Sequence, residues 1–195
     1  SVENQKNYID IIEKSGDRLL NTVNDIIEIS KIESGDISIT KSEVDIIDHL
    51  TTHVTFFTPE AKRKNIDIIM QNNFDGNHLT ITTDKNKLSS ILSNLIKNAR
   101  EATIDNDEHY REKEIKIEIG LYKNKSVYVS IHDNGCGIGK DNLSNIFNHG
   151  FTTKEAGHGF GLHTSANSMT EMGGNLTASS DGHTRGTCFT VSIPL

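Results

Sequence analysis

Residues 126–139 read SVYVSIHDNGCGIG, and this stretch decides how the rest of the chain is interpreted. Its first half alternates apolar and polar residues, which is the period of a half-buried β-strand. EIKIEIGLY (114–122) alternates in the same way, and only KNK separates the two runs, so they predict an antiparallel hairpin. The second run ends at Asp133. Three glycines follow at alternate positions, 135, 137 and 139, so the backbone beside that carboxylate carries few side chains.

Further strands and helices are expected on both sides of this hairpin. Short strands are predicted at 37–40, at 66–71 and 79–83 around an Asp-Gly turn signal, and within 175–182 and 186–193. Helices are predicted at 43–63, 84–103 and 161–173, with Asp84 as the N-cap of the second. Helices segregated from a mainly antiparallel sheet give an α+β protein, a two-layer α/β sandwich.

The N-terminal region predicts one long helix over residues 3–33. Its apolar seam follows three- and four-residue steps through Ile9, Ile12, Leu19, Val23 and Ile26. Such a helix fits packing against its own domain, and it equally fits an intermolecular bundle. We therefore expect a helical segment over residues 1–36 and a single domain over residues 37–195.

Composition narrows the class of protein. The net charge of −7 argues against a nucleic-acid surface, and no apolar run approaches the ~20 residues that span a bilayer. Cys136 and Cys188 lie far apart in the sequence, and a chain of this size needs no disulfide, which favours reduced thiols and a cytoplasmic location, with a disulfide between them as the alternative. The chain begins at Ser1, so a membrane-anchored parent protein stays compatible with these observations.

Three polar stretches at the ends of predicted elements carry candidate chemistry. Asn94 and Asn98 share a helix face, and amide oxygens suit Mg²⁺, although two solvated asparagines are the simpler interpretation. Asp133, followed by glycines, suits an exocyclic amine on a flat ring, although a plain tight turn has the same composition.

The third stretch is GFTTKEAGHGFGLH (150–163). Gly157, Gly159 and Gly161 precede a helix, and bare amides at a helix N-terminus bind anions. Hydroxyls and one cation come from Thr152, Thr153 and Lys154 in the same loop. A flexible surface loop is the alternative for this stretch alone. Taken together, the three stretches indicate a purine nucleotide, its phosphates and Mg²⁺.

Five motifs in this order resemble the sequence boxes of the histidine-kinase ATP-binding domain. They are NLIKNAREA (94–102), DNGCGIG (133–139), IFNHGFTTK (146–154), GHGFGLH (157–163) and GTCF (186–189). That family belongs to the superfamily shared with type II topoisomerases, heat-shock chaperone ATPases and mismatch-repair ATPases. RLLNTVNDIIEISKIESGD (18–36) also resembles the second helix of the kinase dimerisation and phosphoacceptor hairpin.

The resemblance implies a Bergerat-type fold that binds ATP and Mg²⁺, and it implies a role for each matching residue. Asn98 would ligate Mg²⁺, and Asn94 would help to hold the ion and the phosphates. Asp133 would bind the adenine amine in a pocket shaped by Gly135, Gly137 and Ile138, with Thr187 on the same side. The phosphate-binding residues would be Thr152, Thr153, Lys154, Gly157, Gly159, Gly161 and Leu162, and the catalytic ones Asn94 and Lys154.

One departure from the family pattern concerns the phosphoacceptor. None of the nine histidines lies in the family's His-acid context followed by proline. The resemblance therefore implies ATP-dependent phosphorylation of a histidine on an upstream helix outside this chain, with a sensor region and a response-regulator receiver domain as partners. It also implies a homodimer through residues 3–33.

Two other functions stay open from the sequence. The first is an ATP hydrolase of the same superfamily, although those relatives usually place a glutamate where Asn94 stands, to activate water. The second is a nucleotide-sensing or scaffolding module without transfer activity. His49 and His53 have a spacing that zinc can use, but no third ligand lies nearby in the sequence.

Overall fold

The computed structural model describes most of the chain from residue 38 onwards. The described residues are 38–104, 112–123, 125–154, 157, 159–195, Tyr8, Ile12, Ser15, Gly16, Leu19 and Val23. The six isolated residues are helical, and four of them are exposed apolar side chains, Tyr8, Ile12, Leu19 and Val23. The rest of the helix predicted at 3–33, and the boundary at residue 36, lie outside the described residues.

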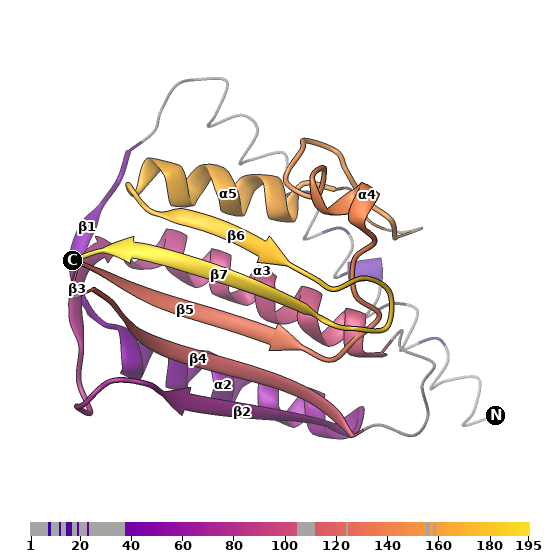
Figure 1. Ribbon diagram of the computed structural model, residues 1–195, viewed down its shortest axis with the longest axis horizontal. Coiled ribbons are helices and arrows are strands. Elements are labelled where there is room, and N and C mark those ends of the chain that lie inside the picture. The colour runs from indigo at the N-terminus through magenta and orange to yellow at the C-terminus, as the bar shows by residue number, and fades with distance from the viewer. Residues whose placement is uncertain are drawn as a thin grey trace.

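A five-stranded sheet forms one layer of the domain (Figure 1). In spatial order its strands are β2 (Ile66–Asn72), β4 (Lys113–Tyr122), β5 (Ser126–Asp133), β7 (Thr187–Pro194) and β6 (Asn175–Ser179). β2 runs parallel to β4, and the other neighbouring strands are antiparallel. β4 and β5 are the predicted hairpin, with Ile117 opposite Ile131, so that prediction is confirmed.

Helices form the second layer and cover one face of this sheet (Figure 1). They are α2 (Ile46–Arg63), α3 (Lys85–Ile104) and α5 (Gly161–Glu171), and a single turn, α4 (Lys140–Leu143), precedes α5. The predicted two-layer α+β sandwich is therefore confirmed. None of the helices in the described residues is long and apolar enough to cross a membrane.

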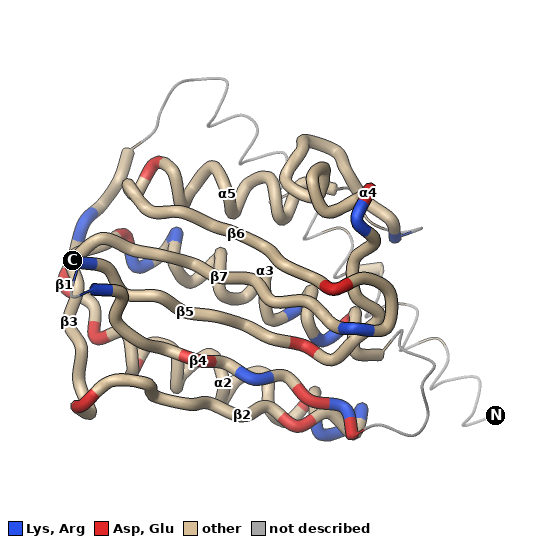
Figure 2. Tube along the Cα trace, viewed as in Figure 1, with Lys and Arg blue, Asp and Glu red and all other residues tan. Residues whose placement is uncertain are grey.

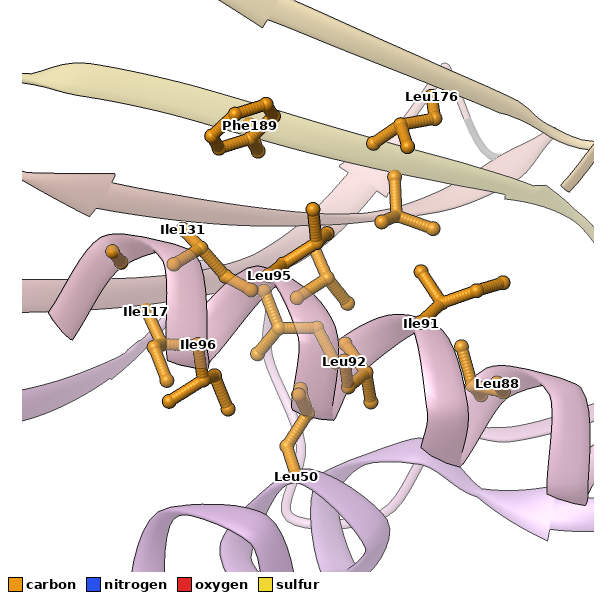
Figure 3. Close-up of a cluster of buried hydrophobic side chains, with 14 of the residues drawn as sticks. Leu50, Leu88, Ile91, Leu92, Leu95, Ile96, Ile117, Ile131, Leu176 and Phe189 are labelled. Carbon is orange, nitrogen blue, oxygen red and sulfur yellow. The ribbon is translucent and has the colours of Figure 1, made fainter. Parts of the chain in front are cut away.

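The core lies between α3 and the inner face of the sheet (Figure 3). Leu92, Leu95 and Ile96 project from α3 toward Ile117 and Ile131 of the central strands, and all five are fully buried. Apolar burial at ~25 cal/mol per Å² is the main term that holds helix and sheet together. Because the helices cover only one face of the sheet, buried and less buried residues alternate along its strands, and this alternation made the strands predictable.

Two aspartates fix where the helices begin. Asp84 Oδ1 accepts from the amides of Asn86 and Lys87, both at 3.0 Å, which confirms the predicted N-cap of α3. Asp45 caps α2 through the amide of Ile47 at 3.0 Å. That cap explains why α2 begins at Ile46, three residues after the predicted start.

The N-terminal strand differs from the prediction. Residues 38–40 are not a strand, and the strand β1 is Lys41–Asp45 instead, paired antiparallel with β3 (Thr80–Asp84). The apolar alternation at 37–40 misled, since β1 itself shows no such alternation and buries only Val44. β1 and β3 form a separate two-stranded sheet, so β2 and β3 on either side of the Asp-Gly signal are not neighbours.

Several loops that contain the predicted polar stretches lie at one end of the sandwich. β5 and α3 end there, α5 begins there, and β6 turns into β7 there (Figure 1). The predicted polar stretches all lie in these segments.

Candidate functional site

A cavity of about 1140 Å³ opens at this end of the sandwich. Its walls come from α3, the loop after β5, the segment before α5 and the start of β7. All of the residues that the sequence predicts for nucleotide binding line this cavity except Gly135. Figure 2 shows acidic and basic residues at the same end, around the end of β5 and the loop between β6 and β7.

Asp133 places a carboxylate in the wall of the cavity with one oxygen unmatched. The residue is 7% exposed, and its Oδ1 accepts from the Gly135 amide at 2.9 Å. Its Oδ2 is buried and has no hydrogen-bond partner among the described residues. Burial raises the pKa of Asp133 to about 6, against the lowering effect of the Gly135 and Thr187 amides. An unmatched buried oxygen is costly, so it marks a place where a ligand donor fits.

The glycines after Asp133 are required by contacts within the protein. A Cβ on Gly135 would lie 2.4 Å from the Ala102 carbonyl carbon at the end of α3. Gly137 has φ +69°, and a Cβ there would lie 2.1 Å from the Gly182 oxygen. The Cys136 amide also donates to the Ala102 oxygen at 2.9 Å. The loop is thus wedged between α3 and the β6–β7 loop, which fixes where Asp133 points.

Asn94 and Asn98 project from α3 into the cavity. Asn94 Nδ2 donates to Ser165 Oγ on α5 at 3.1 Å, and a Cβ on Gly161 would lie 2.7 Å from the same amide group. Asn98 Oδ1 accepts from Lys154 Nζ at 2.9 Å. The first asparagine therefore contacts α5, and the second contacts the loop before it.

The segment before α5 lies across the cavity from α3. Thr152 Oγ1 accepts from the Lys154 amide at 3.1 Å, and Gly157 donates its own amide to the Lys154 carbonyl at 3.1 Å. Thr153 lines the cavity beside them. These contacts fold the loop onto itself, so that the Lys154 side chain can extend to α3.

Apolar residues complete the cavity toward the sheet. Leu162 in the first turn of α5 and Ile138 in the loop after β5 are both partly buried against the core and line the cavity. Thr187 is 5% exposed and pairs with Asp133 across β5 and β7. Gly159 also lines the cavity, with φ +73°. An apolar slot with a few polar groups at its edges is the usual make-up of a small-molecule site.

Glu101 and His183 are among the cavity residues that the sequence did not reveal. Glu101 forms an ion pair with Lys154, and the spacing of three residues from Asn98 on one helix was the available signal. His183 lines the cavity from the β6–β7 loop, and its Nε2 would lie 3.0 Å from a Cβ on Gly139. No sequence motif around His183 predicts this position, because the residue reaches the cavity only through the packing of the β6–β7 loop.

The histidine pair on α2 has a structural explanation. His49 Nε2 lies 3.1 Å from Ser89 Oγ, and His53 Nδ1 lies 3.4 Å from Ser93 Oγ, so both rings face α3. Burial lowers the pKa of His49 to about 4. The described residues hold no group of three or more His, Cys, Asp or Glu side chains that could bind a metal ion.

The residues of the cavity fit a nucleotide with its metal ion. The unmatched Asp133 Oδ2 suits an amine donor, and the oxygens of Asn98 and Glu101 already accept a cation, the Lys154 ammonium. With one carboxylate and one amide, a magnesium ion would need phosphate oxygens as further ligands.

The sequence and the fold both match known proteins. The family model for histidine kinase-, DNA gyrase B- and HSP90-like ATPases matches residues 83–195. The autoinducer 2 sensor kinase/phosphatase LuxQ of Vibrio parahaemolyticus is 33% identical over an alignment of 199 positions, and this alignment covers 99% of this chain and 23% of LuxQ.

The fold also occurs in solved structures. Full-length ShkA in complex with AMPPNP superposes with a TM-score of 0.81 at 26% identity, over 98% of this chain and 39% of that one. The catalytic domain of the histidine kinase ThkA, in a nucleotide-free form, gives a TM-score of 0.67 at 27% identity, over 80% of this chain and 95% of that one.

The family match extends over more than half of the chain, from β3 to the C-terminus. The chain spans about a quarter of the length of LuxQ. From the match and from the cavity geometry, the chain belongs to the family of histidine kinase-, DNA gyrase B- and HSP90-like ATPases, as the motifs in its sequence predicted.

Proposed function

We propose that this chain is the ATP-binding catalytic part of a two-component sensor histidine kinase. It transfers the γ-phosphate of ATP to a histidine on a separate phosphoacceptor helix, in the same polypeptide or in a second copy. The observation that supports this most strongly is Asp133, a buried carboxylate with one oxygen unmatched in the wall of a nucleotide-sized cavity. An adenine amine would satisfy that oxygen.

The remaining residues divide between the base and the phosphates. Thr187, Gly137 and Ile138 line the cavity near Asp133 and shape the adenine side, and Gly135 holds the loop in place. Asn94, Asn98 and the segment from Thr152 to Leu162 face the phosphate side. Bound Mg²⁺ would neutralise phosphate charge, and phosphoryl transfer needs such positioning more than covalent help from the protein. Asn98 would hold the ion and Lys154 would reach the terminal phosphate.

The identity of Asn94 favours a kinase over a hydrolase. An amide cannot accept a proton from water as a carboxylate does, and the Asn94 Nδ2 is already engaged with Ser165. The attacking group would instead be an imidazole supplied by the acceptor helix.

The proposal includes the partners that such a kinase requires. A homodimer through residues 3–33 is supported by the exposed apolar side chains of Ile12, Leu19 and Val23, which fall on the predicted seam. Their exposure leaves a surface that a second helix can cover. A sensor region and a response-regulator receiver domain would complete the pathway, and ATP supply places this domain in the cytoplasm.

Phosphotransfer can be tested with the chain and a separately made acceptor hairpin from LuxQ. With ATP labelled on the γ-phosphate and Mg²⁺, we expect acid-labile label on the histidine of the hairpin. Asp133→Ala should abolish the transfer while the protein stays folded. Nucleotide binding without label on any acceptor would contradict the kinase assignment, and rapid release of free phosphate would indicate a hydrolase.

A further inference from the structure

Two oxygens on α3 converge on a single cation in the cavity. Asn98 Oδ1 lies 2.9 Å from Lys154 Nζ, and Glu101 Oε2 forms an ion pair with the same nitrogen. Asn98 and Glu101 are three residues apart on one helix, so their side chains share a face. All three residues line the nucleotide cavity.

We infer that Asn98 and Glu101 together form a cation site, and that Glu101 is a second ligand group for the Mg²⁺ of a bound nucleotide. The inference rests on the proposed function and adds a carboxylate to the amide that the resemblance implies. Mg²⁺ in nucleotide sites is usually held by one or two carboxylates together with phosphate oxygens. Asn98 alone offers only a neutral oxygen.

Glu101 is the suitable carboxylate of the cavity. The described residues that line the cavity include two carboxylates, Glu101 and Asp133. Asp133 Oδ1 is engaged with the Gly135 amide, and the residue is buried beside Thr187 on the adenine side. The Glu101 side chain is 42% exposed and already adjoins the amide that is expected to ligate the ion.

The shared site makes Lys154 and Mg²⁺ competitors for the same oxygens. If Asn98 and Glu101 held Mg²⁺, Lys154 would lose both partners on α3 and would be free to contact a phosphate. An ion pair between side chains this exposed is weak, so the exchange needs little energy. One carboxylate and one amide are too few to hold Mg²⁺ alone, so the ion is expected to bind only with the nucleotide.

The test is the dependence of nucleotide affinity on Mg²⁺. Calorimetry with AMPPNP gives the Kd in excess Mg²⁺ and in EDTA. The Kd in EDTA divided by the Kd in Mg²⁺ measures how much the metal ion contributes to binding. For Glu101→Gln we expect this ratio to fall about tenfold, because a metal ligand is lost while repulsion of the metal-free nucleotide is removed.

A matched control is Glu171→Gln, which removes a carboxylate paired with Lys87 outside the cavity. Its Mg²⁺ ratio should equal that of the unmodified chain. If Glu101→Gln strengthens binding equally in Mg²⁺ and in EDTA, Glu101 only holds Lys154, and the inference is wrong. If the unmodified chain binds no AMPPNP at all, the proposed function fails first, and the two failures are thereby distinguished.

Discussion

Asp133 and His49 are buried to the same extent, with 7% of each residue exposed, and yet only one of them points to a ligand. His49 lies between α2 and α3, and its Nε2 is 3.1 Å from Ser89 Oγ. Asp133 lies at the end of β5 with Oδ2 unmatched among the described residues. In both residues burial shifts the pKa toward the neutral form, to about 4 for His49 and about 6 for Asp133.

The difference shows that burial and a shifted pKa do not by themselves mark a functional site. A buried polar group that finds its partner within the fold serves packing. A buried group that lacks one, in the wall of a cavity, leaves a free-energy cost that a ligand can remove.

Removing the unmatched carboxylate should abolish most nucleotide binding. Asp133→Ala deletes a charged hydrogen-bond acceptor, which is worth about 2–3 kcal/mol, or roughly 30- to 150-fold in Kd. Calorimetry with AMPPNP and Mg²⁺ measures the change. An unaltered Kd would mean that the nucleotide does not use this oxygen.

The same carboxylate should destabilise the free protein at neutral pH. Its pKa is raised from 3.8 to about 6, so its contribution favours the fold below pH 3.8 and is lost as the pH rises through 6. The difference between these two pKa values corresponds to about 3 kcal/mol. Asp133→Asn should therefore be more stable than the unmodified chain at pH 7, and similar to it near pH 4. Urea unfolding at both pH values tests this, and equal stability at pH 7 would contradict it.

The loop that aims Asp133 should tolerate no side chain at Gly135. An added Cβ would lie 2.4 Å from the Ala102 backbone, and overpacking of this kind costs about 1–3 kcal/mol. Gly135→Ala should lower both the midpoint of unfolding and the nucleotide affinity. Gly16→Ala is the control, because a Cβ there meets nothing within 4 Å among the described residues. Equal effects of the two substitutions would contradict the packing explanation.

Replacing His49 should affect acid stability and leave binding unchanged. Its folded pKa is lowered from 6.5 to about 4, so the stability that it contributes is present above pH 6.5 and is lost as the pH falls toward 4. His49→Gln should flatten the fall in melting temperature between pH 7 and pH 5. The Kd for AMPPNP should stay within about twofold, since the substitution removes no contact with the nucleotide. A large loss of affinity would remove the contrast with Asp133.

The sequence predicts the parts of the fold that depend on local patterns. The period-two runs gave β4 and β5, and Asp84 marked the start of α3 because a cap acts within three residues. The parallel pairing of β2 with β4 escaped prediction, since it joins strands that are far apart in the sequence. β1 was misplaced because its side chains are mostly exposed, so that no apolar alternation marks it.

For the candidate site, too, the sequence predicts local motifs but not the contacts that depend on the whole fold. The motifs indicated which residues would meet, and the structure brings all but Gly135 to one cavity. The structure adds a reason for two of the glycines, because a Cβ at Gly135 or Gly137 would clash with the backbone of Ala102 or Gly182. The sequence could not show that Asp133 would keep one oxygen unmatched, since that depends on every neighbour in the fold. The roles assigned to individual site residues stay predictions.

The most direct test of the account compares ATP with purine riboside triphosphate, which lacks only the exocyclic amine. If that amine donates to Asp133 Oδ2, the unmodified chain should bind ATP at least about tenfold more tightly in Mg²⁺, and Asp133→Ala should bind the two nucleotides equally. Equal affinity of the unmodified chain for both nucleotides would show that this oxygen does not recognise adenine.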